Sequence, residues 1–290
     1  MTDILKKPET DAKRRPWYKR LFGRGNTVIP VVRLQGVIAS DQRQGRLNIA
    51  SVSPLLEKAF ETKKAPAVAL IVNSPGGSPV QSRLIAERIR QLAAEHDKKV
   101  LVFVEDAAAS GGYFIAVAGD EIIADPASLV GSIGVIYASF GFVEAIEKLG
   151  ITRRLYTAGQ NKSTLDPFLP EKAEDVQRIK QLELDVHEVF IDYVKSRRGA
   201  KFTAADSELF TGEFWTAKRG LSLGLVDAVG DIYSTLQARY GKDVELKGIT
   251  PKRSLFQLPR FGFGSHIGGD VAGEVLAKVE DRIHWSRVGL

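Results

Sequence analysis

The sequence has no cysteine and only four histidines among its 290 residues. The absence of cysteine excludes disulfides, thiolate metal sites and a thiol nucleophile. A multi-histidine metal site is not expected either, and no metal or cofactor is predicted; the histidines are His96, His187, His266 and His284. A reactive centre in this chain must therefore be built from other side chains or from backbone groups.

Long apolar runs are also missing. No stretch approaches the roughly 18 apolar residues of a membrane-spanning helix, and the N-terminus lacks the apolar core of a signal peptide. Export by the standard route is not expected. The chain is predicted to be cytoplasmic or peripheral to the inner membrane.

The positive charge is concentrated at the N-terminus. The net charge is +6, and residues 1–24 alone carry eight basic and three acidic side chains. Because the rest of the chain is nearly neutral, no nucleic-acid-binding face is expected. The segment RRPWYKRLFGRG interleaves bases with aromatic residues, which suits contact with an anionic membrane surface. A disordered basic tail explains the same segment equally well.

Strand-like and helix-like segments alternate through the first third of the chain. Apolar runs at 27–39, 67–72 and 99–105 are expected to be strands, and amphipathic segments at 46–63 and 81–96 are expected to be helices. This alternation implies right-handed crossovers and an α/β fold with a largely parallel sheet flanked by helices.

The remaining segments complete three expected parts: a basic arm (1–26), a domain (27–245), and a loop with a C-terminal amphipathic helix (246–290). Further short strands are expected at 121–125, 134–140, 152–158 and 225–227. Further helices are expected after the turn in 108–119, at 142–150, at 171–199, near 230–240 and at 271–285.

Two strand ends carry unusually small residues: NSPGGS (73–78) and DAAASGGYF (106–114). In parallel sheets, reactive groups gather where strands end and helices begin. Ser110 in the second segment is either an N-cap or a nucleophile at the positive end of a helix dipole. Position alone favours the cap, which is the commoner use of such a serine.

A nucleophilic serine needs a base, and no histidine lies in a segment that resembles a site. This argues against a Ser-His-Asp triad and leaves a Ser-Lys dyad as the alternative. Lysine acts as a base only in its neutral form, which burial in an apolar site favours. Lys162 lies in the segment TAGQNKSTLDPF (157–168), which could fold over the serine. A solvated loop lysine is the ordinary interpretation of that position.

Four segments resemble, in family order, the signal peptide peptidase A family of serine proteases in its short, single-domain form. They are NSPGG (73–77), ASGGYFIAVAGDEIIADPASLVGSIGV (109–135), YTAGQNKSTLDPF (156–168) and FTGEFWTAKRGLSLGLVDAVG (210–230). The resemblance implies a Clp protease/crotonase-like fold with a C-terminal helical extension. It also implies a serine endopeptidase that hydrolyses remnant signal peptides or membrane-derived peptides.

The resemblance assigns roles to individual positions. Ser110 matches the nucleophile, Lys162 the general base, and Ser132 a serine that hydrogen-bonds the lysine. The segments that match the oxyanion hole contain Gly76, Gly77 and Gly111. Glycines there would present main-chain N–H groups to a tetrahedral intermediate without a Cβ in the way.

The sequence also departs from the family. Many members have an N-terminal membrane anchor, and long members carry two copies of the fold, whereas this sequence shows no anchor and one copy. A single copy would have to assemble into a ring to enclose a chamber. A homo-oligomer that takes peptide substrates is therefore implied, with peripheral membrane contact through the basic arm as a further possibility.

Three other interpretations compete with the peptidase. A crotonase-like acyl-CoA enzyme would also use a backbone oxyanion hole, but crotonases typically rely on acidic residues and would leave Ser110, Lys162 and Ser132 without a role. A Clp proteolytic subunit would need a histidine in the DEIIADPAS region, which has none. A catalytically inactive scaffold should have lost Ser110 or Lys162, and both are present.

Overall fold

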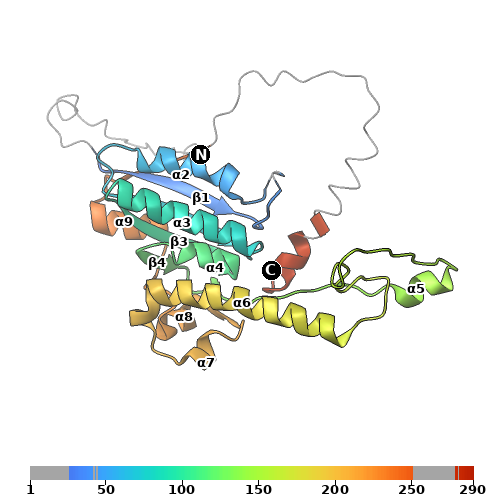
Figure 1. The fold of residues 1–290 in the computed structure, drawn as a ribbon. Coiled ribbons are helices and arrows are strands. Elements are labelled where there is room, and N and C mark those ends of the chain that lie inside the picture. The colour runs from blue at the N-terminus through green and yellow to red at the C-terminus, as the bar shows by residue number, and fades with distance from the viewer. Residues whose placement is uncertain (1–25, 42, 44, 251–277, 280) are drawn as a thin grey trace, which may run out of the picture.

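The structure is a computed structural model that describes residues 26–41, 43, 45–250, 278–279 and 281–290 (Figure 1). Nearly all of the predicted basic arm lies outside these residues, as does most of the predicted part at 246–290. Of the predicted helix at 271–285, residues 278–279 and 281–285 are described, and they are helical.

A mostly parallel sheet of eight strands lies at the centre of the fold. Its order is β6-β5-β3-β2-β1-β8, with β4 pairing with both β3 and β7. Only the β5–β6 pair is antiparallel among the described pairs. The strands are β1 (Val28–Gln35), β2 (Ala67–Ser74), β3 (Lys99–Ala109), β4 (Glu121–Ala124), β5 (Leu129–Gly131), β6 (Phe214–Thr216), β7 (Ala228–Val229) and β8 (Glu245–Gly248).

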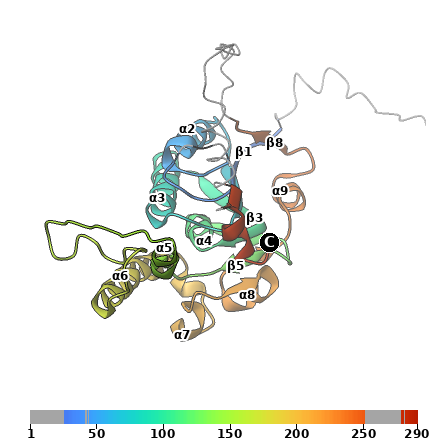
Figure 2. The same cartoon turned by 90° about the vertical axis from the view of Figure 1, so that its right-hand side faces the viewer.

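Helices cover both faces of this sheet, which confirms the expected fold class (Figure 2). One face packs against α2 (Ile49–Phe60), α3 (Pro79–Glu95) and α4 (Gly111–Ala116), and the other against α9 (Ile232–Tyr240). Every residue of β2 is buried, as its continuous apolar run predicts for a strand covered on both faces. The remaining helices are α5 (Val143–Lys148), α6 (Ala173–Arg198), α7 (Asp206–Leu209), α8 (Ala217–Leu223) and the 3₁₀ turn Gly199–Lys201.

Residues 134–172, called the projecting segment below, leave the sheet and extend along the first half of α6 (Figure 1). The strands predicted at 134–140 and 152–158 are wrong, because this segment contains α5 and turns but no strand. A strand needs a neighbouring strand for its backbone hydrogen bonds, and the segment runs where the sheet provides none. The strand predicted at 225–227 lies slightly later, in β7.

Candidate active site

Ser110 occupies the sharp turn between β3 and α4. Its backbone angles are φ 50° and ψ −120°, a conformation that is strained for any residue but glycine. It stands at the N-cap position, yet its side chain makes no capping hydrogen bond. The Ser110 N–H donates to the carbonyl of Gly131 at 2.8 Å, and its carbonyl accepts from Phe114 N at 2.9 Å. The backbone is therefore fixed while the hydroxyl is not used as a cap, as at the nucleophile turns of other hydrolases.

Gly76 and Gly111 lie directly against this serine, and Gly77 lies against Gly111. A Cβ built on Gly76 would fall 2.8 Å from Ser110 Cβ and 2.9 Å from Gly111 N. A Cβ built on Gly111 would fall 3.3 Å from Gly77 N. The structure therefore brings together the two glycine-containing turns that the sequence singled out.

The three glycines differ in what their N–H groups do. The Gly76 N–H donates to Ser74 Oγ at 3.2 Å. Within the part of the chain that the structure describes, the N–H groups of Gly77 and Gly111 have no hydrogen-bond acceptor. Two free donors beside a serine are the arrangement that an oxyanion hole requires. Gly76 contributes the space that a side chain would otherwise fill.

Ile38 holds the glycine turn in place. Its N–H donates to the Gly76 carbonyl at 2.8 Å, and its carbonyl accepts from Ser78 N at 2.7 Å. A Cβ on Gly77 would fall only 2.0 Å from the Ile38 carbonyl oxygen. Ser78 then caps α3 by accepting from Gln81 N. The turn is consequently fixed on both sides by backbone hydrogen bonds.

Ser132 lies just after β5. It directly follows Gly131, whose carbonyl accepts the hydrogen bond from the Ser110 N–H. It also has a positive φ, 54°, and its N–H donates to the carbonyl of Glu213 at 2.6 Å. Gly131 lies against the ring of Trp215, where a Cβ would fall 2.8 Å from a ring carbon. The antiparallel partner β6 therefore fixes the position of Ser132 relative to Ser110.

His187 reaches the same region, although sequence reasoning placed no histidine there. It lies on α6, and its Nε2 is 3.0 Å from the carbonyl oxygen of Ile133. The two residues are 54 positions apart, and no local motif marks His187. Only the packing of α6 against the chain after β5 could have found it.

Lys162 is exposed on the projecting segment, which leads away from the sheet and α4 (Figure 1). Its loop is fastened to the beginning of α6, where Arg178 donates to Asn161 Oδ1 at 2.9 Å and pairs with Asp175 at 2.7 Å. The helix reaches α4 only further along, through Phe190. At 1.5 Å per residue, the 12 positions from Arg178 to Phe190 correspond to about 18 Å.

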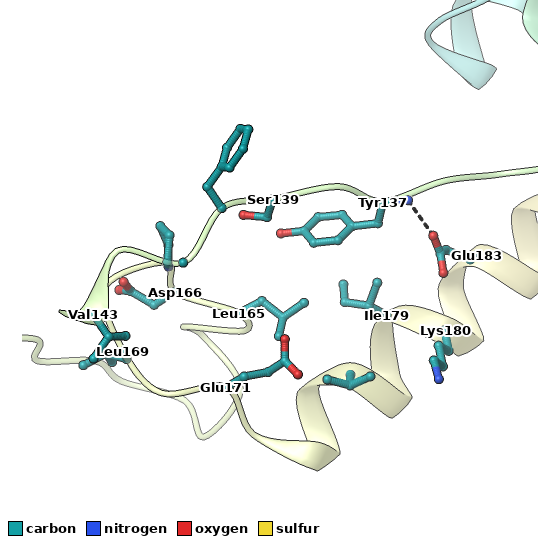
Figure 3. A pocket seen from close by; sticks show the side chains of 14 residues that line it. Tyr137, Ser139, Val143, Leu165, Asp166, Leu169, Glu171, Ile179, Lys180 and Glu183 are labelled. Carbon is teal, nitrogen blue, oxygen red and sulfur yellow. Dashed lines mark hydrogen bonds between the residues drawn. The ribbon is translucent and has the colours of Figure 1, made fainter. Parts of the chain in front are cut away.

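The projecting segment and α6 together line an open pocket of about 400 Å³. Figure 3 shows Tyr137, Leu165 and Ile179 facing this space, and the N–H of Tyr137 donates to Glu183 at 2.6 Å. Large apolar side chains of the segment are also exposed, Tyr156 by 90%. The others include Ile136, Phe140, Leu149 and Ile151. Apolar surface of this extent is characteristic of an interaction surface.

A buried polar network anchors the helix that follows Ser110. Tyr113 donates to the carbonyl of Leu225 at 2.8 Å, and burial raises the pKa of its hydroxyl, which stays neutral. Arg198 pairs with Asp227 at 2.9 Å. Burial works to raise the pKa of Asp227, but hydrogen bonds from Arg198 and Lys201 outweigh it and the pKa is lowered. The network ties α4 and the end of α6 to the same segment, residues 225–227.

The described residues contain no group of three or more histidine and acidic side chains able to hold a metal ion. They also contain no helix that is long and apolar enough to cross a membrane.

Comparison with known proteins identifies relatives. A family model described as "Peptidase family S49" matches residues 93–247. The "Putative protease MJ0651" of Methanocaldococcus jannaschii is 31% identical over 78% of this chain and 73% of that protein. "Serine protease SPPA, chloroplastic" of Arabidopsis thaliana is also 31% identical, over 78% of this chain but 34% of its own length.

A Brucella melitensis protein named "Na(+)/H(+) antiporter NhaA" is 54% identical over 93% of this chain, which spans only 38% of that protein. Most of the antiporter-named chain therefore has no counterpart here. Among solved structures, the 1510-N membrane-bound stomatin-specific protease in complex with a substrate peptide is 19% identical. The match covers 79% of this chain and 94% of that one, with a TM-score of 0.47.

Proposed function

Because this chain belongs to peptidase family S49, we propose that it is a serine endopeptidase with Ser110 as nucleophile and Lys162 as general base. The observation that carries the proposal is the turn at Ser110. The hydroxyl of this serine caps no helix, and the free N–H groups of Gly77 and Gly111 lie beside it.

The proposed reaction uses these groups in sequence. Neutral Lys162 takes the proton of Ser110 Oγ, and the oxygen attacks the carbonyl carbon of the scissile peptide bond. The oxyanion of the tetrahedral intermediate accepts hydrogen bonds from Gly77 N and Gly111 N. The C–N bond then breaks, and the protonated lysine gives its proton to the leaving amine. Water hydrolyses the acyl-enzyme by the same steps and restores both side chains.

We propose that Lys162 reaches the Ser110 of a neighbouring copy in a homo-oligomeric ring. Two observations support this assembly: Lys162 lies on a segment that projects away from Ser110 of its own chain, and that segment exposes large apolar side chains. Contact with a second copy would bury this surface.

Mixing two inactive variants tests the shared site. If Ser110→Ala and Lys162→Ala proteins are unfolded and refolded together, an intact serine can meet an intact lysine in about one quarter of the sites of a randomly mixed ring. We therefore expect peptide hydrolysis to return to about that fraction of the wild-type rate. Each variant refolded alone is the control. A mixture as inactive as its components would contradict a site shared between copies.

Remnant signal peptides or other membrane-derived peptides are the proposed substrates, in line with the name of an Enterococcus faecium relative, "Putative signal peptide peptidase SppA", which is 30% identical over 72% of this chain. Degradation of a peptide library by the purified protein, with Ser110→Ala as the control, tests this directly. Trapping of Ser110 by a serine-directed phosphonate supports the peptidase, whereas turnover of an acyl-CoA would favour the crotonase-like alternative.

The pH dependence identifies the base. A lysine must be neutral to accept the proton from Ser110, so we expect the rate to rise with pH along a single limb. Ser132→Ala should lower the rate less than Lys162→Ala, because it removes an orienting hydrogen bond and not the proton acceptor. Initial rates across the pH range measure both effects.

His187 is the sharpest control, since its ring contacts the carbonyl of Ile133, the residue after Ser132. His187→Gln should leave the limb in place, as should replacement of His96, His266 or His284. If His187→Gln removed the limb and the activity together, His187 would be the base and the lysine mechanism would be wrong.

A further inference from the structure

The ladder between β2 and β3 changes register just before the two reactive turns. Val72 pairs with Val104, but Ser74 pairs with Ala108. The ladder thus advances by two residues along β2 and by four along β3. The two extra residues, Glu105 and Asp106, form a bulge that lies four residues before Ser110. A bulge of this kind re-aims the chain that follows it.

The side chain of Asn73 fills the gap that the bulge leaves in the ladder. Its Oδ1 accepts from the N–H of Ala107 at 3.2 Å, and its Nδ2 donates to Asp106 Oδ2 at 2.6 Å. Asn73 is only 5% exposed, and Ala107 is fully buried. Without this carboxamide the Ala107 N–H would be a buried donor without a partner, which proteins avoid.

Only a short carboxamide supplies what this position needs, one acceptor and one donor on the same group. An aspartate would offer no donor and would bring a second carboxylate against Asp106. Asn73 is also joined to the other turn, because it directly precedes Ser74, whose Oγ accepts from Gly76 N. The residue therefore connects the glycine turn on β2 with the serine turn on β3.

We propose that Asn73 is a positioning residue for the peptidase reaction, a role that rests on the proposed function. Its carboxamide locks the bulge at Glu105 and Asp106. The bulge in turn sets the position of Ser110 at the end of β3 relative to the free N–H groups of Gly77 and Gly111. Asn73 touches neither Ser110 nor the substrate, and acts only through the path of β3.

Three variants test this role by steady-state kinetics. Asn73→Ala should lower kcat by about 10²-fold, the cost of a displacement of about 1 Å at a reacting centre, with KM changed less than about threefold. Asn73→Asp should lower kcat at least as much, because two carboxylates then face each other. Asn73→Asp/Asp106→Asn should recover kcat to within about fivefold of wild type, since the exchanged pair can make the same hydrogen bonds.

Asp120→Ala is the matched control, because Asp120, just before β4, bonds to the other end of β3. Asp120 Oδ2 accepts from the N–H of Val100 at 2.8 Å, a side-chain-to-backbone bond like that of Asn73, at the opposite end of β3. Its loss should lower the thermal midpoint and leave kcat unchanged. If Asn73→Ala behaved like Asp120→Ala, with lower stability and unchanged kcat, the positioning role would be wrong.

Hydrogen exchange separates this proposal from the proposed function. In Asn73→Ala, amide exchange should accelerate in a peptide that covers residues 105–111, and not in one that covers 99–104. If wild type cleaves no peptide, the proposed function fails. The exchange comparison still tests whether the Asn73 carboxamide holds the bulge in place. Unchanged exchange at 105–111, or a double variant as slow as Asn73→Asp, would overturn the role of the Asn73 carboxamide.

Discussion

Replacement of Ser110 or Lys162 by alanine is expected to lower kcat for peptide hydrolysis by at least about 10³-fold, with the protein still folded. Ser110→Ala removes the nucleophile, and Lys162→Ala removes the group that takes its proton. Because the two act as one unit, the double variant should be no slower than either single variant. Rates for a fluorogenic peptide, with thermal unfolding of each protein, measure the effect.

Lys148→Ala provides the matched control for the lysine. Lys148 also lies exposed on the projecting segment, at the end of α5, so its replacement removes the same charge from the same part of the molecule. Its activity should remain at the wild-type level. Near-normal turnover by Lys162→Ala would end the dyad hypothesis, whatever the result for Ser110→Ala.

Gly76→Ala is expected to lower kcat by about 10²-fold or more, the loss that follows when an oxyanion hole is disabled. The new methyl group would fall 2.8 Å from Ser110 Cβ and 2.9 Å from Gly111 N. It would therefore occupy the space beside the serine in which the oxyanion of the intermediate must lie. KM and kcat for the same peptide separate this effect from weaker binding.

Gly241→Ala is the matched control for backbone strain. Gly241 has φ 93° and open space around it, whereas Gly76 has φ 105° and the serine turn beside it. Both substitutions place alanine at a strained positive φ, at a cost of about 1–3 kcal/mol of stability, and Gly76→Ala adds the close contacts with the serine turn. Only Gly76→Ala should lose activity. Equal kcat values for the two variants would mean that the space beside Gly76 is not part of the reaction site.

Periodicity in the sequence was sufficient for the first three strands and the main helices, but it predicted none of the short strands β5, β6 and β8. The strands expected at 27–39, 67–72 and 99–105 became β1, β2 and β3, because continuous β-branched and apolar runs are stable where both faces are buried. The same kind of run failed at 134–140 and 152–158. The composition there suits a strand, but the chain offers no neighbouring edge to pair with.

The sequence by itself determined that Ser110 and the Gly76–Gly77 pair end adjacent strands, and hence that they lie at one edge of the sheet. Which backbone N–H groups are free at this edge depended on the tertiary structure. Ser74 Oγ accepts a hydrogen bond from the N–H of Gly76, whereas the N–H groups of Gly77 and Gly111 stay free. The bulge held by Asn73 was likewise invisible, since it consists of bonds between residues more than 30 positions apart.

The placement of Lys162 was decided only by the tertiary structure. The segment around Lys162 resembles the family's base segment and occurs in the family's order along the chain. Neither observation says how far Lys162 lies from Ser110. The direction of α6 decides this, and that direction is set where Phe190 and Tyr193 pack on Phe114 at ring distances of 5.0 and 4.4 Å. Packing between distant segments depends on the whole core, whereas a motif reflects only the residues next to it in the chain.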